Sequence, residues 1–200
     1  SYTDAAVASD MLALAGELDA GPAILVGNSM TAASAVIAAT DDPTAVAGIV
    51  LLGPFAREVP TPGWQKLAFN LMMMPPWGRS LWTGYYRKQL HPGTKPPDHD
   101  AHVAALRQNL GEPGRFNAFR AQTRNSHAES GSRLERVACP SFVIMGTADP
   151  DFPDPVFEAN QLGEALGGEV ILVEGVGHYP QSQAPEKVVE AILSLISRTG

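Results

Sequence analysis

Residues 23–31 read Ala-Ile-Leu-Val-Gly-Asn-Ser-Met-Thr, a short uninterrupted apolar run that leads into a small polar turn. An apolar run without polar alternation is typical of a strand that is covered on both faces in a parallel sheet. Residues 31–40 are almost all small or apolar and predict a buried helix, and residues 47–52 predict a second buried strand. Strand, helix and strand in this order predict a right-handed parallel crossover.

The same alternation returns near the end of the chain. Residues 141–145 and 170–173 predict two more buried strands, with helical periodicity over 155–166 between them. Helices are also predicted over 4–18, ahead of the first strand, and over 185–197, where an apolar stripe follows a proline near the start. The predicted fold class is therefore α/β, with a mostly parallel sheet flanked by helices.

The middle of the chain differs in composition. Residues 55–132 are punctuated by prolines, which are incompatible with a continuation of the same sheet, and they hold all three tryptophans. Helical patterns cover 98–110 and 115–123. We interpret 55–132 as a helical insertion that divides the core into residues 1–54 and 133–200.

Composition narrows the classes of partner. Fourteen Lys and Arg against 21 Asp and Glu give a net charge of −7 and a pI near 5.1, which argues against nucleic acid and against an anionic membrane surface. The single cysteine, Cys139, cannot close an intrachain disulfide, which favours a cytoplasmic location. No apolar run approaches the roughly 18 residues of a membrane span. We expect no membrane partner, no metal and no cofactor.

The turn Gly27-Asn28-Ser29-Met30-Thr31 follows a predicted strand and begins a predicted helix, the context of a nucleophile elbow. Such an elbow holds a serine at a sharp turn, and small residues are needed where strand and helix approach each other. Gly27 supplies one of them, and Thr31 replaces the second glycine of the usual Gly-x-Ser-x-Gly pattern. A serine at a helix start is also often only an N-cap. We predict that Ser29 is a nucleophile, with the N-cap as the alternative.

An acidic loop follows the strand over 141–145. Asp149 is the first acid after that strand, at the carboxyl end where open α/β sheets place their sites. Asp151 and Asp154 come later among prolines, and we interpret them as turn formers or helix caps. Asp149 is the predicted partner of a catalytic base.

One histidine leaves a strand in the same way. His178 follows the strand over 170–173, and a neutral imidazole bonded to a carboxylate can take the proton of a serine near pH 7. The other histidines fall within 55–132 and are interpreted as solvated surface or helix residues: His91, His99, His102 and His127. The predicted catalytic residues are Ser29, Asp149 and His178.

The chain order Ser29, Asp149, His178 resembles that of the α/β-hydrolase fold and differs from that of chymotrypsin or subtilisin. With the motifs at 27–31, 146–149 and 175–180, the resemblance to α/β-hydrolases with a helical cap extends over essentially the whole length. It implies that residues 55–132 form the cap. Dehalogenase and epoxide-hydrolase relatives carry an Asp nucleophile, so Ser29 argues against both.

The resembled family has four strands, a helix and a loop with a second oxyanion-hole N–H ahead of the nucleophile strand. Here residues 1–22 precede that strand, where roughly 60 to 80 more are expected. The strand over 23–26 is then expected to be an exposed edge that invites self-association or pairing with a partner segment. Met30 N–H remains as oxyanion donor. Either the protein is longer, or a partner chain completes the sheet, or efficient catalysis has been lost.

The leading functional hypothesis is a serine hydrolase that cleaves a carboxylic ester or a similar small acyl substrate. Trp77, Trp82 and Met73 are expected to line an apolar acyl pocket, although packing of the insertion onto the sheet explains them equally well. One alternative is a hydrolase-like ligand receptor or signalling partner with little turnover. Another is a C–C bond hydrolase or a perhydrolase of the same fold.

Overall fold

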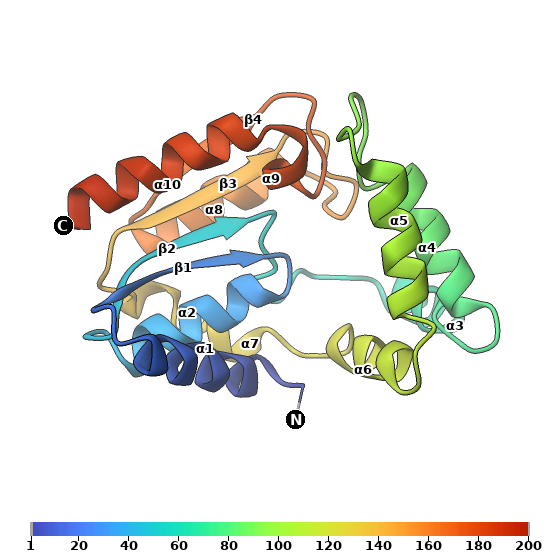
Figure 1. Ribbon diagram of the computed structural model, residues 1–200, viewed down its shortest axis with the longest axis horizontal. Helices are drawn as coiled ribbons and strands as arrows, with labels where there is room; N and C mark the ends of the chain where they lie inside the picture. Colours follow the sequence, from blue (N-terminus) through green and yellow to red (C-terminus); the bar gives the residue numbers. More distant parts are fainter. Residues whose placement is uncertain (1, 200) are drawn as a thin grey trace.

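The computed structural model describes residues 2–199, and within them the chain forms a four-stranded parallel sheet with strand order β1-β2-β3-β4 (Figure 1). The strands are β1 (Ala23–Asn28), β2 (Val46–Leu52), β3 (Ser141–Gly146) and β4 (Glu169–Val173). The helices of the core are α1 (Asp4–Leu18), α2 (Thr31–Asp41), α8 (Pro155–Leu166), α9 (Pro180–Gln183) and α10 (Pro185–Thr199). The predicted α/β fold is confirmed.

Between β2 and β3 the chain forms helices without adding a strand. They are α3 (Gly63–Met72), α4 (Gly78–Lys88), α5 (His99–Asn109), α6 (Arg115–Gln122), α7 (Ala128–Gly131) and the 3₁₀ helix η1 (Leu134–Arg136). Figure 1 shows α3 to α6 beyond the arrowheads of the strands, on the side where the carboxyl ends of the sheet lie. None of the helices within residues 2–199 is both long and apolar enough to cross a bilayer.

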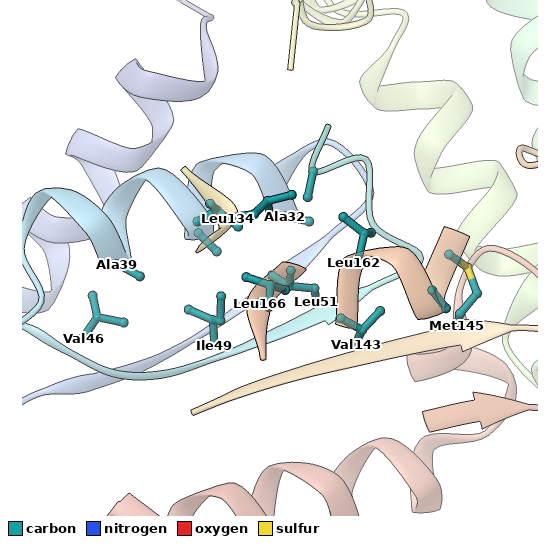
Figure 2. Close-up of a cluster of buried hydrophobic side chains, with 14 of the residues drawn as sticks. Ala32, Ala39, Val46, Ile49, Leu51, Leu134, Val143, Met145, Leu162 and Leu166 are labelled. Atoms are coloured by element: carbon teal, nitrogen blue, oxygen red, sulfur yellow. The ribbon is translucent and has the colours of Figure 1, made fainter. Parts of the chain in front are cut away.

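The sheet is covered on both faces because its central strands are apolar throughout. In β2, Ile49 and Leu51 face one layer, whereas Val50 and Leu52 face the other. The first layer is formed by α2 and α8, and Figure 2 shows its buried side chains between helix and strand. The second layer is formed by α10, through residues such as Leu195. A rigid two-sided core therefore fixes where the carboxyl ends of the strands lie.

Strand β1 lies at the edge of this sheet. Its register pairs Leu25 with Ile49 of β2, and within residues 2–199 it has a strand neighbour on that side only. The expectation that the strand is covered on both faces holds only in part, because Val26 is 43% exposed. Helix α2 covers one face, which its small residues allow it to approach closely, and α1 packs against α2 through Ala8 and Ile37.

Two histidines of the insertion are buried. The interpretation as a solvated-surface or helix residue is wrong for His91, which lies outside the helices, whereas His99 begins α5 as a helix residue. His91 is 2% exposed and His99 is 5% exposed. Their rings lie 4.8 Å apart, and His91 stacks on Tyr179 with ring centroids 5.1 Å apart. His91 is buried because the insertion packs against the loop that follows β4, and His99 is buried within the insertion against His91 and Tyr86.

Candidate active site

The turn after β1 holds Ser29 in an unusual backbone conformation. Its φ is +58°, in the left-handed region that a residue with a side chain rarely adopts. Main-chain hydrogen bonds hold it there, because Ser29 N–H donates to Leu52 O at 2.9 Å and Ser29 O accepts from Ala32 N–H at 3.1 Å. A Cβ at Gly27 would lie 2.7 Å from the carbonyl oxygen of Thr31, so glycine is needed where β1 passes α2.

The N-cap alternative for Ser29 does not fit this turn. The residue at the N-cap position of α2 is Met30, and its side chain makes no cap hydrogen bond. The Ser29 hydroxyl instead lies 2.8 Å from Nε2 of His178. The side chain is therefore directed across the end of the sheet toward the loop after β4.

Three of the predicted site residues meet at the carboxyl end of the sheet. His178 bridges Ser29 on one side and Asp149 on the other, with its Nδ1 2.7 Å from Asp149 Oδ2. A carboxylate only accepts hydrogen bonds, so Nδ1 carries the hydrogen and Nε2 is left to accept one from the Ser29 hydroxyl. We call this hydrogen-bonded chain the Ser29–His178–Asp149 relay. Asp149 and His178 are each 2% exposed, whereas Ser29 is half-buried.

The backbone of the acidic loop orients Asp149. Its second oxygen, Oδ1, accepts a hydrogen bond from the backbone N–H of Asp151 at 3.0 Å. Both carboxylate oxygens of Asp149 are thus engaged, one by the imidazole and one by the loop. Asp154, directly after Pro153, caps α8 by accepting from Phe157 N–H at 2.9 Å, in agreement with its predicted role as a helix cap.

We call residues 174–183, which follow β4 and include α9, the histidine loop. The insertion contacts this loop through a short stretch between α4 and α5. His178 N–H donates to Leu90 O at 3.1 Å, and Gln183 Nε2 donates to Pro92 O at 2.7 Å and to Thr94 O at 2.9 Å. We call residues 90–94 the anchor segment. A Cβ at Gly177 would lie 2.5 Å from Leu90 O, so the two segments touch through their backbones.

Sequence reasoning missed Asn28 as a third support of the histidine loop. Its side-chain amide donates to Leu52 O at 2.8 Å and to His178 O at 3.3 Å, so it joins the ends of β1 and β2 to this loop. The rings around His178 were also missed, and they belong to Phe55, Phe152 and Tyr179. A polar residue directly before the elbow serine was the one available signal for Asn28.

Asp151 lies closer to the histidine than its interpretation as a turn former implied. One of its carboxylate oxygens, Oδ2, is 3.6 Å from His178 Nδ1. The other, Oδ1, accepts a hydrogen bond of 2.5 Å from the hydroxyl of Tyr85 on α4. Two carboxylates therefore face the same side of the imidazole, and one of them is tied to the insertion.

The surroundings of His178 favour its protonated form. Burial alone lowers the pKa of His178, but the hydrogen bond with Asp149 and the charges of Asp149 and Asp151 outweigh burial. The pKa of His178 is therefore raised above its ordinary value of 6.5. The ring is consequently a stronger base than a free imidazole while it keeps a neutral form that can accept a proton.

Metal binding would compete with this arrangement. Among residues 2–199, the side chains of Asp149, Asp151 and His178 offer ligand atoms within 4.8 Å of one another. The Nδ1 hydrogen of His178 already lies between the imidazole and Asp149 Oδ2, so a cation there would have to displace it. The hydrogen bond between His178 and Asp149 and the one from Tyr85 to Asp151 account for the proximity of these three groups.

The three residues expected to line a pocket differ in how far their side chains are exposed to solvent. Met73 is 2% exposed, whereas Trp77 is 49% exposed and its indole N–H donates to Leu71 O. Trp82 is half-buried and packs on Tyr85, with ring centroids 5.7 Å apart. Of the three, Trp82 is thus connected to the relay by a chain of contacts through Tyr85.

Comparison with known proteins agrees with this architecture. A parallel sheet with helices on both faces and a polar relay at the strand ends defines a hydrolase-like α/β protein. The family model described as "Alpha/beta hydrolase family" matches residues 1–191. The chain belongs to the alpha/beta hydrolase family, and this membership supports a hydrolytic enzyme. A search of curated protein sequences found no relative.

Several solved structures share the fold at low sequence identity. A thermophilic esterase from Thermogutta terrifontis is 22% identical, with a TM-score of 0.77 over 98% of this chain and 73% of that chain. An esterase from Exiguobacterium antarcticum is 17% identical, with a TM-score of 0.79 over 98% of this chain and 74% of that one. A meta-cleavage product hydrolase from Pseudomonas fluorescens IP01 is 15% identical, with a TM-score of 0.74 over 100% and 74%.

Proposed function

We propose that the protein is a serine hydrolase that cleaves a carboxylic ester or a similar small acyl substrate. The observation that carries the proposal is the unbroken relay from Ser29 through His178 to Asp149, with contacts of 2.8 and 2.7 Å. This is the spacing at which a base can take a proton from a nucleophile and be oriented by a third group. Family membership and esterase neighbours support the same class of reaction.

The proposed reaction begins with attack of Ser29 Oγ on the acyl carbon while Nε2 of His178 takes the hydroxyl proton. Asp149 holds the imidazole in the required tautomer and stabilises the imidazolium. The first N–H groups of a helix have no partner within the helix, so the Met30 N–H at the start of α2 is our proposed donor to the tetrahedral oxyanion. His178 then returns the proton to the leaving alcohol, and water releases the acyl group by the same steps.

The insertion, residues 55–132, is the proposed cap and provides the proposed substrate contacts. Its helices α3 to α6 lie beyond the carboxyl ends of the strands, where the relay is also found (Figure 1). Within it we propose Trp77, Trp82 and Met73 as substrate-binding residues, of which Trp82 has the support of its contact with Tyr85. A cytoplasmic location remains the proposal drawn from the single cysteine.

Labelling with a fluorophosphonate followed by peptide mass spectrometry tests the nucleophile. The adduct is expected on Ser29 and is expected to disappear in Ser29→Ala, while Ser80→Ala, at an exposed serine of α4, labels as the wild type does. Adduct on another serine, or equal labelling of Ser29→Ala, refutes the assignment.

Turnover on a panel of p-nitrophenyl esters then separates an esterase from a receptor of the same fold. Steady hydrolysis that is lost in Ser29→Ala supports the proposal, whereas labelling without turnover favours the receptor or signalling alternative. A meta-cleavage product is assayed beside these esters, because one structural neighbour is a meta-cleavage product hydrolase.

A further inference from the structure

We propose that Asp151 is a second carboxylate that acts on His178 through its charge, and that Tyr85 of the insertion helix α4 holds this carboxylate in position. The proposal rests on the proposed function, because it concerns how His178 works as the base. It gives Asp151 and Tyr85 the part of positioning residues, since neither lies on the reacting atoms.

The distances separate the parts of the two acids. Asp149 Oδ2 lies 2.7 Å from Nδ1 of His178 and receives its hydrogen, whereas Asp151 Oδ2 lies 3.6 Å from the same atom, beyond hydrogen-bond length. Asp151 therefore contributes charge without competing for the proton. The side chains of His178 and Asp151 are 2% and 18% exposed, so water screens this attraction only weakly.

The backbone and the side chain of Asp151 make separate contacts, the first with Asp149 and the second with His178 and Tyr85. Its backbone N–H donates to Asp149 Oδ1 and so orients the first acid. Its carboxylate faces His178 and Tyr85. A substitution of the Asp151 side chain by a residue of the same shape keeps the first contact and removes only the charge.

Tyr85 matters because burial disfavours the ionised form of the Asp151 carboxylate. Burial raises the pKa of Asp151, and the charge of Asp149 adds to this, while the charge of His178 and the hydrogen bond from Tyr85 oppose it. A hydrogen bond donated to a carboxylate favours its ionised form. Tyr85 itself stays a neutral donor, because burial and the charge of Asp151 raise the pKa of its hydroxyl.

The other titratable group at this point is Tyr179, which follows His178 in the chain. Burial and the neighbouring Tyr86, together with the charges of Asp151 and Asp149, raise its pKa, so it too stays uncharged. The groups that set the charge state of the histidine are thus Asp149 and Asp151. During turnover the O–H bond of Ser29 breaks as an N–H bond forms at Nε2, and both carboxylates then stabilise the imidazolium until that proton passes to the leaving alcohol.

The experiment measures the rate of Ser29 phosphonylation as a function of pH, across the range in which histidines titrate. It compares the wild type with Asp151→Asn, Tyr85→Phe and the double variant. Tyr86→Phe is the matched control, because Tyr86 is the next residue of the same helix and packs on His91 and Tyr179. Circular dichroism checks that each variant is folded.

Removal of a nearby negative charge lowers the pKa of His178, so the acidic limb of the profile moves to lower pH. For Asp151→Asn we expect a shift of about one pH unit, the lower end of what an opposite charge at about 4–6 Å produces. The plateau rate falls by no more than about tenfold, the factor that corresponds to one pKa unit. Tyr85→Phe shifts the limb in the same direction by less, the double variant matches Asp151→Asn, and Tyr86→Phe matches the wild type.

Wild-type profiles for both Asp151→Asn and Tyr85→Phe overturn the proposal. A further shift caused by Tyr85→Phe in the Asp151→Asn background overturns the part assigned to Tyr85. If Asp151→Asn does not fold, Tyr85→Phe alone decides the matter. A wild type that is not labelled at Ser29 refutes the proposed function, and the same variants are then compared by NMR titration of the His178 ring, which needs no reaction.

Discussion

Gly27 is the position at which the geometry of the strand-to-helix turn makes the sharpest prediction. A Cβ there would lie 2.7 Å from Thr31 O and 2.9 Å from the backbone of Ala32, whereas ordinary contacts begin at 3.4 Å. These are backbone atoms of the first turn of α2, so in Gly27→Ala the helix has to retreat from β1 by about 0.7 Å. Overpacking of this kind costs about 1–3 kcal/mol of unfolding free energy.

The same displacement acts on activity, because Ser29 lies between the strand and the helix that separate. A misplacement of about 1 Å can lower a rate by about 10², so ester hydrolysis by Gly27→Ala is expected to fall about 10- to 100-fold. Urea unfolding followed by circular dichroism measures the stability, and initial rates measure the activity.

Gly16→Ala is the matched control for Gly27→Ala. Gly16 lies within α1, and nothing within 4 Å would meet its Cβ. Alanine is favoured over glycine in a helix by about 0.8–1.0 kcal/mol, so this variant is expected to be more stable than the wild type with unchanged activity. A Gly27→Ala protein with the unfolding midpoint and hydrolytic rate of the wild type would refute the reasoning.

Three other substitutions test separate parts of the molecule. Asp149→Asn is expected to lower kcat by about 10⁴ in an ester assay, because the imidazole loses the acceptor that fixes its tautomer, and a larger loss in Asp151→Asn would contradict this order. Arg57→Ala removes two hydrogen bonds, of 2.8 and 2.6 Å, from Glu158, whose side chain is 7% exposed. Urea unfolding should show a loss of about 3 kcal/mol, the lower end for a broken buried pair because the Arg57 side chain is 30% exposed, and an unchanged midpoint would count against it. The edge strand β1 predicts self-association in size-exclusion chromatography that Val26→Lys reduces, whereas a monomeric wild type would show that the edge does not pair.

The strands of the sheet could be predicted because each is a short, almost uninterrupted apolar run. The confirmed strand β1 nevertheless extends through Gly27 and Asn28, which pair with Leu51 and Leu52 of β2. Neither Gly27 nor Asn28 is a residue type typical of strands. Both are paired because the backbone of β2 continues alongside them. The limits of an element are thus set by contacts that a local pattern does not contain.

The residues brought together by the relay were accessible to sequence reasoning because each is the first suitable side chain after a strand. The contacts of the insertion with the site could not be predicted from the sequence. Tyr85 and Asp151 are 66 positions apart, and nothing in the spacing of aromatic residues along α4 distinguishes Tyr85 from Tyr86. The burial of His91 likewise depends on how the insertion packs on the loop after β4.

The anchor segment has an evolutionary consequence. Its hydrogen bonds to the histidine loop use the main-chain oxygens of Leu90, Pro92 and Thr94, which most side chains at these positions would leave in place. Gly177, opposite, has no such freedom, since a Cβ would lie 2.3 Å from the Pro92 ring. The helices on either side of the anchor segment can therefore diversify in sequence, and with them the substrates that are accepted. Descendants that keep the main-chain hydrogen bonds of the anchor segment also keep His178 in its position.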